Sequence, residues 1–352
     1  MSTSTTSIDR ELLRRLPKAE LHCHLDGSVR PATLIELAKE YGAPMPRPDA
    51  DSLRDYMRAS DVHSLEEYLE RFSVTLSVMQ TSDALERIAY ELAADAAADG
   101  VRYIEVRYAP VLNVQGGLSL GEAIEAPLRG LARAEQDHGT IGRVIVCALR
   151  HLDPDVSLQL AELAVDYRAR GVVGFDLAGP EAAYPASHHS RAFAYAREHG
   201  VACTCHAGEG AGADSVREAV HVCGAARLGH AARLGGDAAL IDYIGEHRIP
   251  LEICLTSNVQ TGAAPSYERH PVRQYFDRGL NVVLNTDNRL MSDTTLTGEY
   301  ALAASRLRFT ADELSAIALN GFESAFLPLD ERHGLIERAR QEIAIWRAGD
   351  LA

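Results

Sequence analysis

The feature that most constrains this chain is a series of eight short apolar segments, most of them followed by a helical stretch. Strands are expected at residues 20–25, 101–108, 143–149, 172–177, 201–206, 226–230, 251–255 and 282–285. Helices are expected between them at residues 84–99, 119–136, 157–170, 188–199 and 214–222. Strands that alternate with helices form parallel sheets with right-handed crossovers. Eight such units predict an α/β fold closed into a (β/α)8 TIM barrel. An open, doubly wound sheet is the alternative, but no G-x-G-x-x-G follows the first strand.

One connection is far longer than a simple loop. About 75 residues separate the first expected strand from the second, and they suggest helices at residues 52–59 and 64–78. We expect a helical lid or insertion over about residues 30–90, within one domain that spans residues 1–352 and is frayed over residues 1–10. An apolar stripe on the second helix is either ordinary core or a wall over the barrel mouth that contacts a ligand. It consists of Leu65, Tyr68, Leu69 and Phe72.

The charge balance restricts the partners that this chain can bind. Fifty acidic and 35 basic residues give a formal net charge of −15. An acidic surface repels nucleic acids and anionic membranes, so a small neutral partner is expected. The amino terminus lacks the apolar run of a signal peptide, and no segment reaches the roughly 18 apolar residues of a membrane helix. We therefore expect a cytoplasmic protein, in which six cysteines form no disulfide framework.

Polar side chains gather where the expected strands end, which is where barrel active sites lie. His22 and His24 end the first strand, and their spacing places both on one face. His206 ends the fifth strand, His230 ends the sixth, and Asp287 follows the eighth. A lone H-x-H is weak evidence, but imidazole and carboxylate groups at four strand ends predict a catalytic metal site. Nitrogen and oxygen ligands with an open position suit Zn²⁺.

These residues belong to a series of motifs in a fixed order. They are H-C-H-L-D-G at 22–27, D-L-A-G-x-E at 176–181, H-A-G-E at 206–209, R-L-G-H at 227–230, T-S-N-x-x-T-G at 256–262 and N-T-D at 285–287. The series resembles the adenosine deaminase family of the amidohydrolase superfamily, from about residue 16 to residue 329. The resemblance implies hydrolytic deamination of adenosine or 2′-deoxyadenosine to the inosine nucleoside and ammonia, in purine salvage. It also implies one Zn²⁺ per chain and a free purine nucleoside as the small-molecule partner.

The resemblance further implies a role for each site residue. Glu209 corresponds to the acid that protonates purine N1, which requires a raised pKa of the kind that burial supplies. His230 corresponds to the histidine that orients the attacking hydroxide, and Asp287 also contacts the attacking water. The metal ligands correspond to His22, His24, His206 and Asp287.

The substrate contacts follow from the same resemblance. Gly179 corresponds to the backbone donor to purine N3, and Asp26 to the acid that binds the ribose 5′-hydroxyl. A carboxylate there repels a 5′-phosphate, which favours a nucleoside over a nucleotide. Asn288 stands where animal members have an aspartate that contacts purine N7, and its amide can donate without a pKa shift. Pro180 is a second departure, because animal members have an acidic residue at this position. Glu181 is expected to support the site without contacting the substrate.

Several alternatives stay open at this point. Relatives with the same chemistry deaminate adenine, adenosine monophosphate or 6-aminodeoxyfutalosine. A catalytically inactive nucleoside-binding protein is a further alternative, although every ligand and the proton donor are present. The zinc deaminases marked by P-C-x-x-C are excluded because that motif is absent. The oligomeric state and the native metal are left open.

Overall fold

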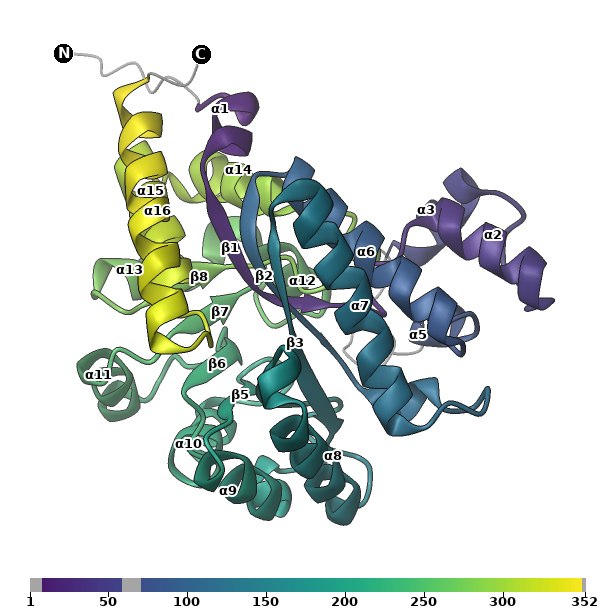
Figure 1. The fold of residues 1–352 in the computed structure, drawn as a ribbon. Helices are drawn as coiled ribbons and strands as arrows, with labels where there is room; N and C mark the ends of the chain where they lie inside the picture. Colours follow the sequence, from purple (N-terminus) through teal and green to yellow (C-terminus); the bar gives the residue numbers. More distant parts are fainter. Residues whose placement is uncertain (1–7, 59–70, 350–352) are drawn as a thin grey trace.

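The computed structural model describes residues 8–58 and 71–349. Its centre is a barrel of eight parallel strands, in which each strand pairs with the next along the chain (Figure 1). This confirms the predicted (β/α)8 fold, and every strand lies within two residues of its expected bounds. The strands are β1 (Lys18–His24), β2 (Val101–Tyr108), β3 (Ile141–Leu149), β4 (Val172–Ala178), β5 (Ala202–Ala207), β6 (Arg227–His230), β7 (Leu251–Ile253) and β8 (Val282–Leu284).

The barrel closes between its last strand and its first. Just beyond β8, Asp287 forms a parallel backbone bridge with Cys23 of β1. The amide of Asp287 donates to the carbonyl of His22 at 2.9 Å, and the amide of His24 donates to the carbonyl of Asp287 at 2.7 Å. Closure satisfies backbone groups that an open sheet edge would expose. It also places Asp287 beside the two histidines at the end of β1.

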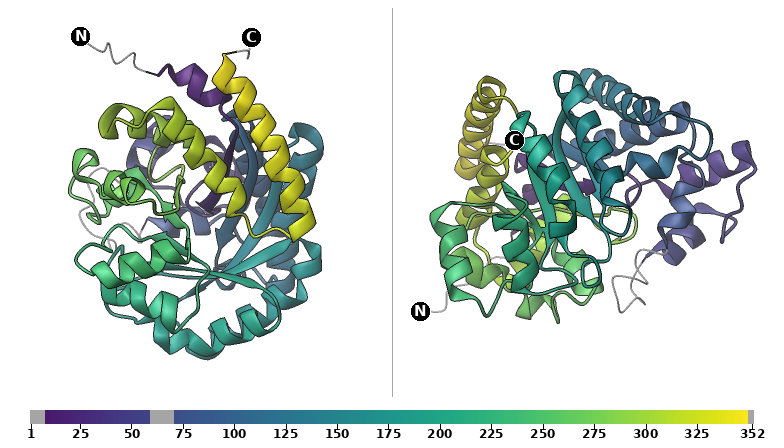
Figure 2. Two further views of the ribbon diagram at one scale, coloured as in Figure 1. Left: turned by 90° about the vertical axis from the view of Figure 1, so that its left-hand side faces the viewer. Right: turned by 90° about the horizontal axis from the view of Figure 1, so that it is seen from below.

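Helices surround the barrel and cover its outer face (Figures 1 and 2). Helix α7 shows how the sequence sets their limits. It begins with a capping box between Ser119 and Glu122 and ends at Gly139, whose φ of 76° suits glycine. The α-helices are α1 (Arg10–Arg15), α2 (Pro31–Tyr41), α3 (Ala50–Met57), α5 (Phe72–Leu76), α6 (Ser82–Ala98), α7 (Leu120–His138), α8 (Pro154–Asp166), α9 (Ser190–Glu198), α10 (Ala213–His221), α11 (Ala238–Glu246), α12 (Leu255–Gln260), α13 (Val272–Asp277), α14 (Leu296–Leu307), α15 (Ala311–Glu323) and α16 (Leu329–Ala348). Short 3-10 helices are η1 (Pro110–Asn113), η2 (Arg168–Arg170), η3 (Ala186–His189) and η4 (Tyr267–Arg269).

The long connection after β1 carries α2, α3 and α5 before α6, which packs against α7. Helices α2 and α3 pack against each other and project from one side of the barrel (Figure 1). The helix expected at residues 52–59 is present as α3. Of the helix expected at 64–78, the described part contains α5, which begins at Phe72. Leu65, Tyr68 and Leu69 of the apolar stripe lie outside the described residues.

The first and last helices, α1 and α16, lie side by side (Figures 1 and 2). The indole N–H of Trp346 donates to the carbonyl of Leu12 at 2.7 Å, which joins α16 to α1. Since α1 leads directly into β1, this contact lies at the amino ends of the strands, opposite the expected site. The six cysteines are all buried and unpaired, as expected from their number. Among the described helices, none combines the length and apolar character needed to cross a membrane.

Candidate metal centre and active site

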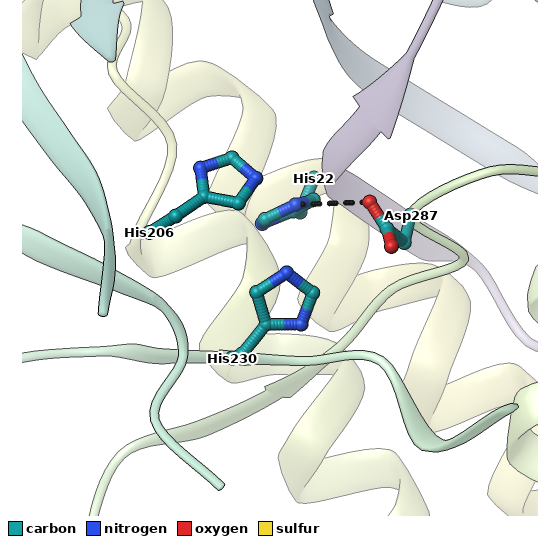
Figure 3. A group of neighbouring side chains, drawn as sticks. All are labelled: His22, His206, His230 and Asp287. Carbon is teal, nitrogen blue, oxygen red and sulfur yellow. Dashed lines mark ion pairs between the residues drawn. The ribbon is translucent and has the colours of Figure 1, made fainter. Parts of the chain in front are cut away.

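The predicted metal ligands meet at the carboxyl end of the barrel. His22 and His24 come from β1, His206 from β5, His230 from β6, and Asp287 follows β8. One ligand atom from each of His22, His206, His230 and Asp287 lies within 4.8 Å of the others (Figure 3). Residues far apart in the sequence thus surround a space that can hold one metal ion.

His24 reaches the same space, although it is not in that four-residue group. Its Nε2 lies 3.1 Å from Nε2 of His206 and 3.4 Å from Oδ1 of Asp287. Ligands about 2.0–2.2 Å from a tetrahedral zinc are separated by roughly 3.3 Å, so these distances fit a shared ion. The four ligands expected from the resemblance are therefore together, with His230 as a fifth neighbour.

In two of these histidines, Nδ1 faces a buried carboxylate on the side of the ring away from the metal-binding space. Nδ1 of His22 lies 2.8 Å from Glu252, and Nδ1 of His206 lies 3.1 Å from Asp176. A carboxylate that accepts the Nδ1 proton leaves the Nε2 lone pair free to bind a metal. Nε2 of His22 is buried and makes no hydrogen bond, and it lies 3.3 Å from Oδ1 of Asp287, a separation that fits two atoms bound to one ion (Figure 3). Imidazole nitrogens with one carboxylate oxygen are a donor set that fits zinc.

These supporting carboxylates belong to a buried ionic network that the sequence analysis did not single out. Arg107 on β2 lies 3.0 Å from Asp176 and 2.9 Å from Glu252. Ser257 on α12 adds a hydrogen bond of 2.6 Å to Asp287. The available signal in the sequence was the presence of charged residues inside apolar strands, because such groups are rarely buried unless paired. That signal does not reveal which groups pair.

Two site residues have a left-handed backbone conformation. The φ angle is 63° at His230 and 62° at Asp287. Such conformations cost a non-glycine residue about 1–3 kcal/mol and persist only where the surrounding structure holds them. At Asp287 the backbone bonds to β1 supply that restraint. Strained residues of this kind cluster at functional sites.

Glu209 lies on the loop after β5, next to the metal-binding space. Its carboxyl group is buried, and Oε2 is 3.5 Å from Nε2 of His230. Burial, together with the negative charge of Asp287, raises the pKa of Glu209 to about 7. A carboxyl group with such a pKa can hold a proton near neutral pH and deliver it to a substrate.

Glu181 holds the loop that carries Glu209. Its carboxylate accepts hydrogen bonds of 2.6–3.1 Å from the backbone amides of Gly208, Glu209, Gly210 and Ala211. Burial alone would raise the pKa of Glu181, but its hydrogen bonds and the nearby positive charge of Arg150 lower it. The carboxylate therefore stays ionised and fixes the loop. The sequence suggested only that this acid lies behind the substrate.

A mostly apolar cavity of about 340 Å³ opens beside His24. Its volume lies in the range of small-molecule pockets. Three of the expected substrate contacts line it, namely Asp26, Phe72 and Gly179, and Phe72 belongs to the inserted segment. The residues that matter most here are His24, Asp26, Phe72, Leu112, His151 and Gly179.

The expected substrate contacts differ in how the structure places them. Oδ1 of Asp26 is buried without a partner, and burial raises the pKa of this carboxyl group to about 7. Gly179 has a φ of 108°, which other residues rarely adopt. Asn288 is buried but is not among the residues that line the cavity. Its Oδ1 packs against Gly27, where a Cβ atom would collide with it. A contact between Asn288 and purine N7 stays a prediction.

The fold and the site together define a metal-dependent hydrolase of the barrel type. Residues 17–342 match the family model described as Adenosine deaminase. Adenosine deaminase 1 from Streptomyces coelicolor is 45% identical over 352 residues, with 95% of this chain and 88% of the relative covered. The probable adenosine deaminase of Dictyostelium discoideum is 43% identical over 93% of this chain, which spans only 42% of that longer relative. The chain belongs to the adenosine deaminase family.

Solved structures agree with this assignment. An amidohydrolase from Burkholderia ambifaria, determined with bound Zn, superposes with a TM-score of 0.89 at 28% identity and covers 99% of this chain and 95% of its own. Adenine deaminase from Arthrobacter aurescens gives a TM-score of 0.87 at 26% identity, with 94% and 99% covered. Similar barrels thus include one with zinc and one that acts on a free base.

Proposed function

We propose that this chain hydrolytically deaminates adenosine and 2′-deoxyadenosine, with one Zn²⁺ per chain. The observation that carries the proposal is the position of Glu209, a buried acid with a raised pKa whose carboxyl group lies 3.5 Å from His230 at the metal-binding space. Membership of the adenosine deaminase family supports the same chemistry. The ligand set is His22, His24, His206 and Asp287, as the resemblance implies.

The site residues account for the addition of water to purine C6. His22, His24, His206 and Asp287 would hold the zinc ion, which would supply hydroxide near neutral pH by lowering the pKa of water. Glu209 donates its proton to purine N1 while the C6–O bond forms, which accommodates the loss of aromaticity. His230 and Asp287 hold the attacking oxygen in line with C6. The C6–N6 bond then breaks, the proton of the new C6 hydroxyl group passes to the departing nitrogen, and ammonia and inosine result.

Asp26 supports a nucleoside as the substrate. Its unpartnered Oδ1 faces no protein donor, and its side chain lines the cavity that receives the ligand. We propose that it accepts a hydrogen bond from the ribose 5′-hydroxyl. A 5′-phosphate would instead place two acidic groups together, which disfavours a nucleotide.

Replacement of Asp26 by alanine tests this contact. Because the pKa of Asp26 is raised to about 7, the carboxyl group is partly ionised near neutral pH, and a hydrogen bond to it contributes about 0.5–3 kcal/mol, so kcat/KM for adenosine should fall about 2–100-fold in Asp26→Ala. Adenine has no ribose and therefore serves as the internal control, with any activity toward it unchanged. Steady-state kinetics with both compounds measures the difference. Equal losses of kcat/KM for adenosine and adenine would show that Asp26 does not contact the ribose.

The function itself is tested by an ammonia-release screen on the purified protein. Adenosine, 2′-deoxyadenosine, adenine, adenosine monophosphate and a 5′-substituted adenosine are compared, and bound metal is quantified in the same samples. Preference for the two nucleosides with about one zinc per chain supports the proposal. Preference for adenine or a 5′-extended compound would support hydrolytic deamination but reject adenosine and 2′-deoxyadenosine as the substrates. No release from any of the five by the zinc-loaded protein would reject deamination of these purines.

A further inference from the structure

His230 is linked to two buried residues that have no place in the proposed mechanism so far. Its Nδ1 lies 2.8 Å from Nδ2 of Asn258, on α12. Oδ1 of Asn258 lies 3.1 Å from Nε2 of His270, which follows η4. Nδ1 of His270 lies 3.1 Å from the backbone nitrogen of Val272. All three side chains are at least 97% buried, so water does not compete for these contacts.

The donors and acceptors in this series of hydrogen bonds are fixed at its end farthest from His230. A backbone N–H can only donate, so Nδ1 of His270 must accept from Val272 and carries no proton. The proton of His270 is then on Nε2, where it is donated to the oxygen of Asn258. This orients the amide, because the opposite orientation would place an N–H of Asn258 against the N–H of His270. The amide nitrogen of Asn258 therefore faces His230.

The hydrogen bond from Asn258 determines which ring nitrogen of His230 carries the proton. The amide nitrogen of Asn258 is a donor, so Nδ1 of His230 must accept, which excludes a proton on that nitrogen. The ring proton is then on Nε2, the atom that lies 3.5 Å from Glu209. A protonated Nε2 can donate to an oxygen but cannot bind a metal or remove a proton. His230 is thereby separated in role from His22 and His206, whose Nδ1 atoms face carboxylates.

We propose that Asn258 and His270 are positioning residues that hold His230 as the Nε2–H tautomer, so that it donates to the attacking oxygen. The inference rests on the proposed deamination for its catalytic consequence, whereas the tautomer can be measured without any substrate. His230 then stabilises charge on the attacking oxygen, and Glu209 is the residue that transfers a proton to the purine. His24 rather than His230 completes the ligand set, in agreement with the resemblance.

The isosteric variant Asn258→Asp tests the proposal. A carboxylate still accepts from His270, but its second oxygen now faces Nδ1 of His230 and draws a proton there. Loss of one preorganised donor typically lowers kcat about 10²–10³-fold, and we expect a loss of that size with little change in KM. Gln274→Glu is the control, because it adds the same charge at an exposed position of α13, outside the hydrogen-bonded residues. It is expected to keep kcat close to the wild-type value.

Nitrogen NMR of ¹⁵N-histidine-labelled, zinc-loaded protein reads the tautomer directly. The spectrum should show His230 protonated at Nε2 in the wild type and at Nδ1 in Asn258→Asp, with the signal assigned by its loss in His230→Gln. A wild-type His230 protonated at Nδ1, or an Asn258→Asp variant with unchanged kcat, would overturn the proposal. An inactive wild type with the expected tautomer would reject the proposed function and leave the positioning role intact.

A second pair of variants covers the case in which Asn258→Asp does not fold. His270→Gln keeps an N–H donor for Asn258, whereas His270→Leu removes it and frees the amide to turn. We expect the leucine variant to lose at least tenfold more kcat than the glutamine variant and to show a mixture of His230 tautomers in the NMR spectrum. Equal kcat and identical His230 signals in the two variants would overturn the proposal.

Discussion

Glu209→Gln is expected to lower kcat for adenosine about 10²–10⁴-fold while zinc stays bound, because general acid catalysis contributes an effect of that size. Glutamine keeps the shape and polarity of the side chain but has no acidic proton for purine N1. The carboxyl group of Glu209 is buried, 3.5 Å from His230, and its pKa is raised to about 7, so a protonated form is available near neutral pH. Steady-state kinetics and zinc quantification on the same preparation measure the two quantities.

The matched control is Glu246→Gln, at the exposed end of α11. It makes the same chemical change away from the site and should leave kcat and zinc content unaltered. Wild-type turnover in a zinc-loaded Glu209→Gln variant would remove Glu209 as the proton donor. Loss of zinc in that variant would instead show that this carboxyl group supports the metal, which the proposed ligand set does not include.

The barrel could be predicted because its determinants are local. Strands such as β2, β4 and β8 are marked by apolar, β-branched residues, and helix boundaries such as that of α7 by the capping box of Ser119 and Glu122. The ligands could be predicted for a similar reason. The period of two on β1 places His22 and His24 on one face, and parallel strands bring their carboxyl ends together.

The support of the site could not be predicted because its partners are distant in the sequence. Arg107 and Glu252 are 145 positions apart, and each is a charged residue in an otherwise buried strand. A sequence shows that such residues exist but not which pairs form, since pairing depends on the register around the closed barrel. The same holds for Asn258 on α12 and His230 on β6, whose hydrogen bond forms only in the folded barrel.

Arg107 should be far more important for stability than a surface arginine, because it is the cation between two buried carboxylates. Its side chain is fully buried, 3.0 Å from Asp176 and 2.9 Å from Glu252. Removal of one partner from a buried ion pair costs about 3–5 kcal/mol, since the remaining charge stays without compensation. We expect a loss of that size in the free energy of unfolding of Arg107→Met, measured by urea denaturation of the metal-free protein.

Arg102→Met is the matched control on the same strand. Arg102 pairs with Glu342 at 2.9 Å, but the two side chains are 40% and 38% exposed, and a pair of that kind contributes about 0–1 kcal/mol. Equal losses in the two variants would contradict the role given to Arg107.

A second measurement on Arg107→Met concerns the metal. Asp176 and Glu252 orient His206 and His22, and loss of such support typically lowers metal affinity about 10–100-fold. Chelator competition should therefore show weaker zinc binding in Arg107→Met and unchanged binding in Arg102→Met. Glu252 keeps Arg227 as a second cation at 2.6 Å, whereas Arg107 is the arginine that pairs with Asp176. If uncompensated charge is the cause of the instability, adding Asp176→Asn to Arg107→Met should recover part of the lost stability, because the carboxylate left without a cation is then neutral. The barrel interior would in that case couple folding to metal binding through one buried arginine.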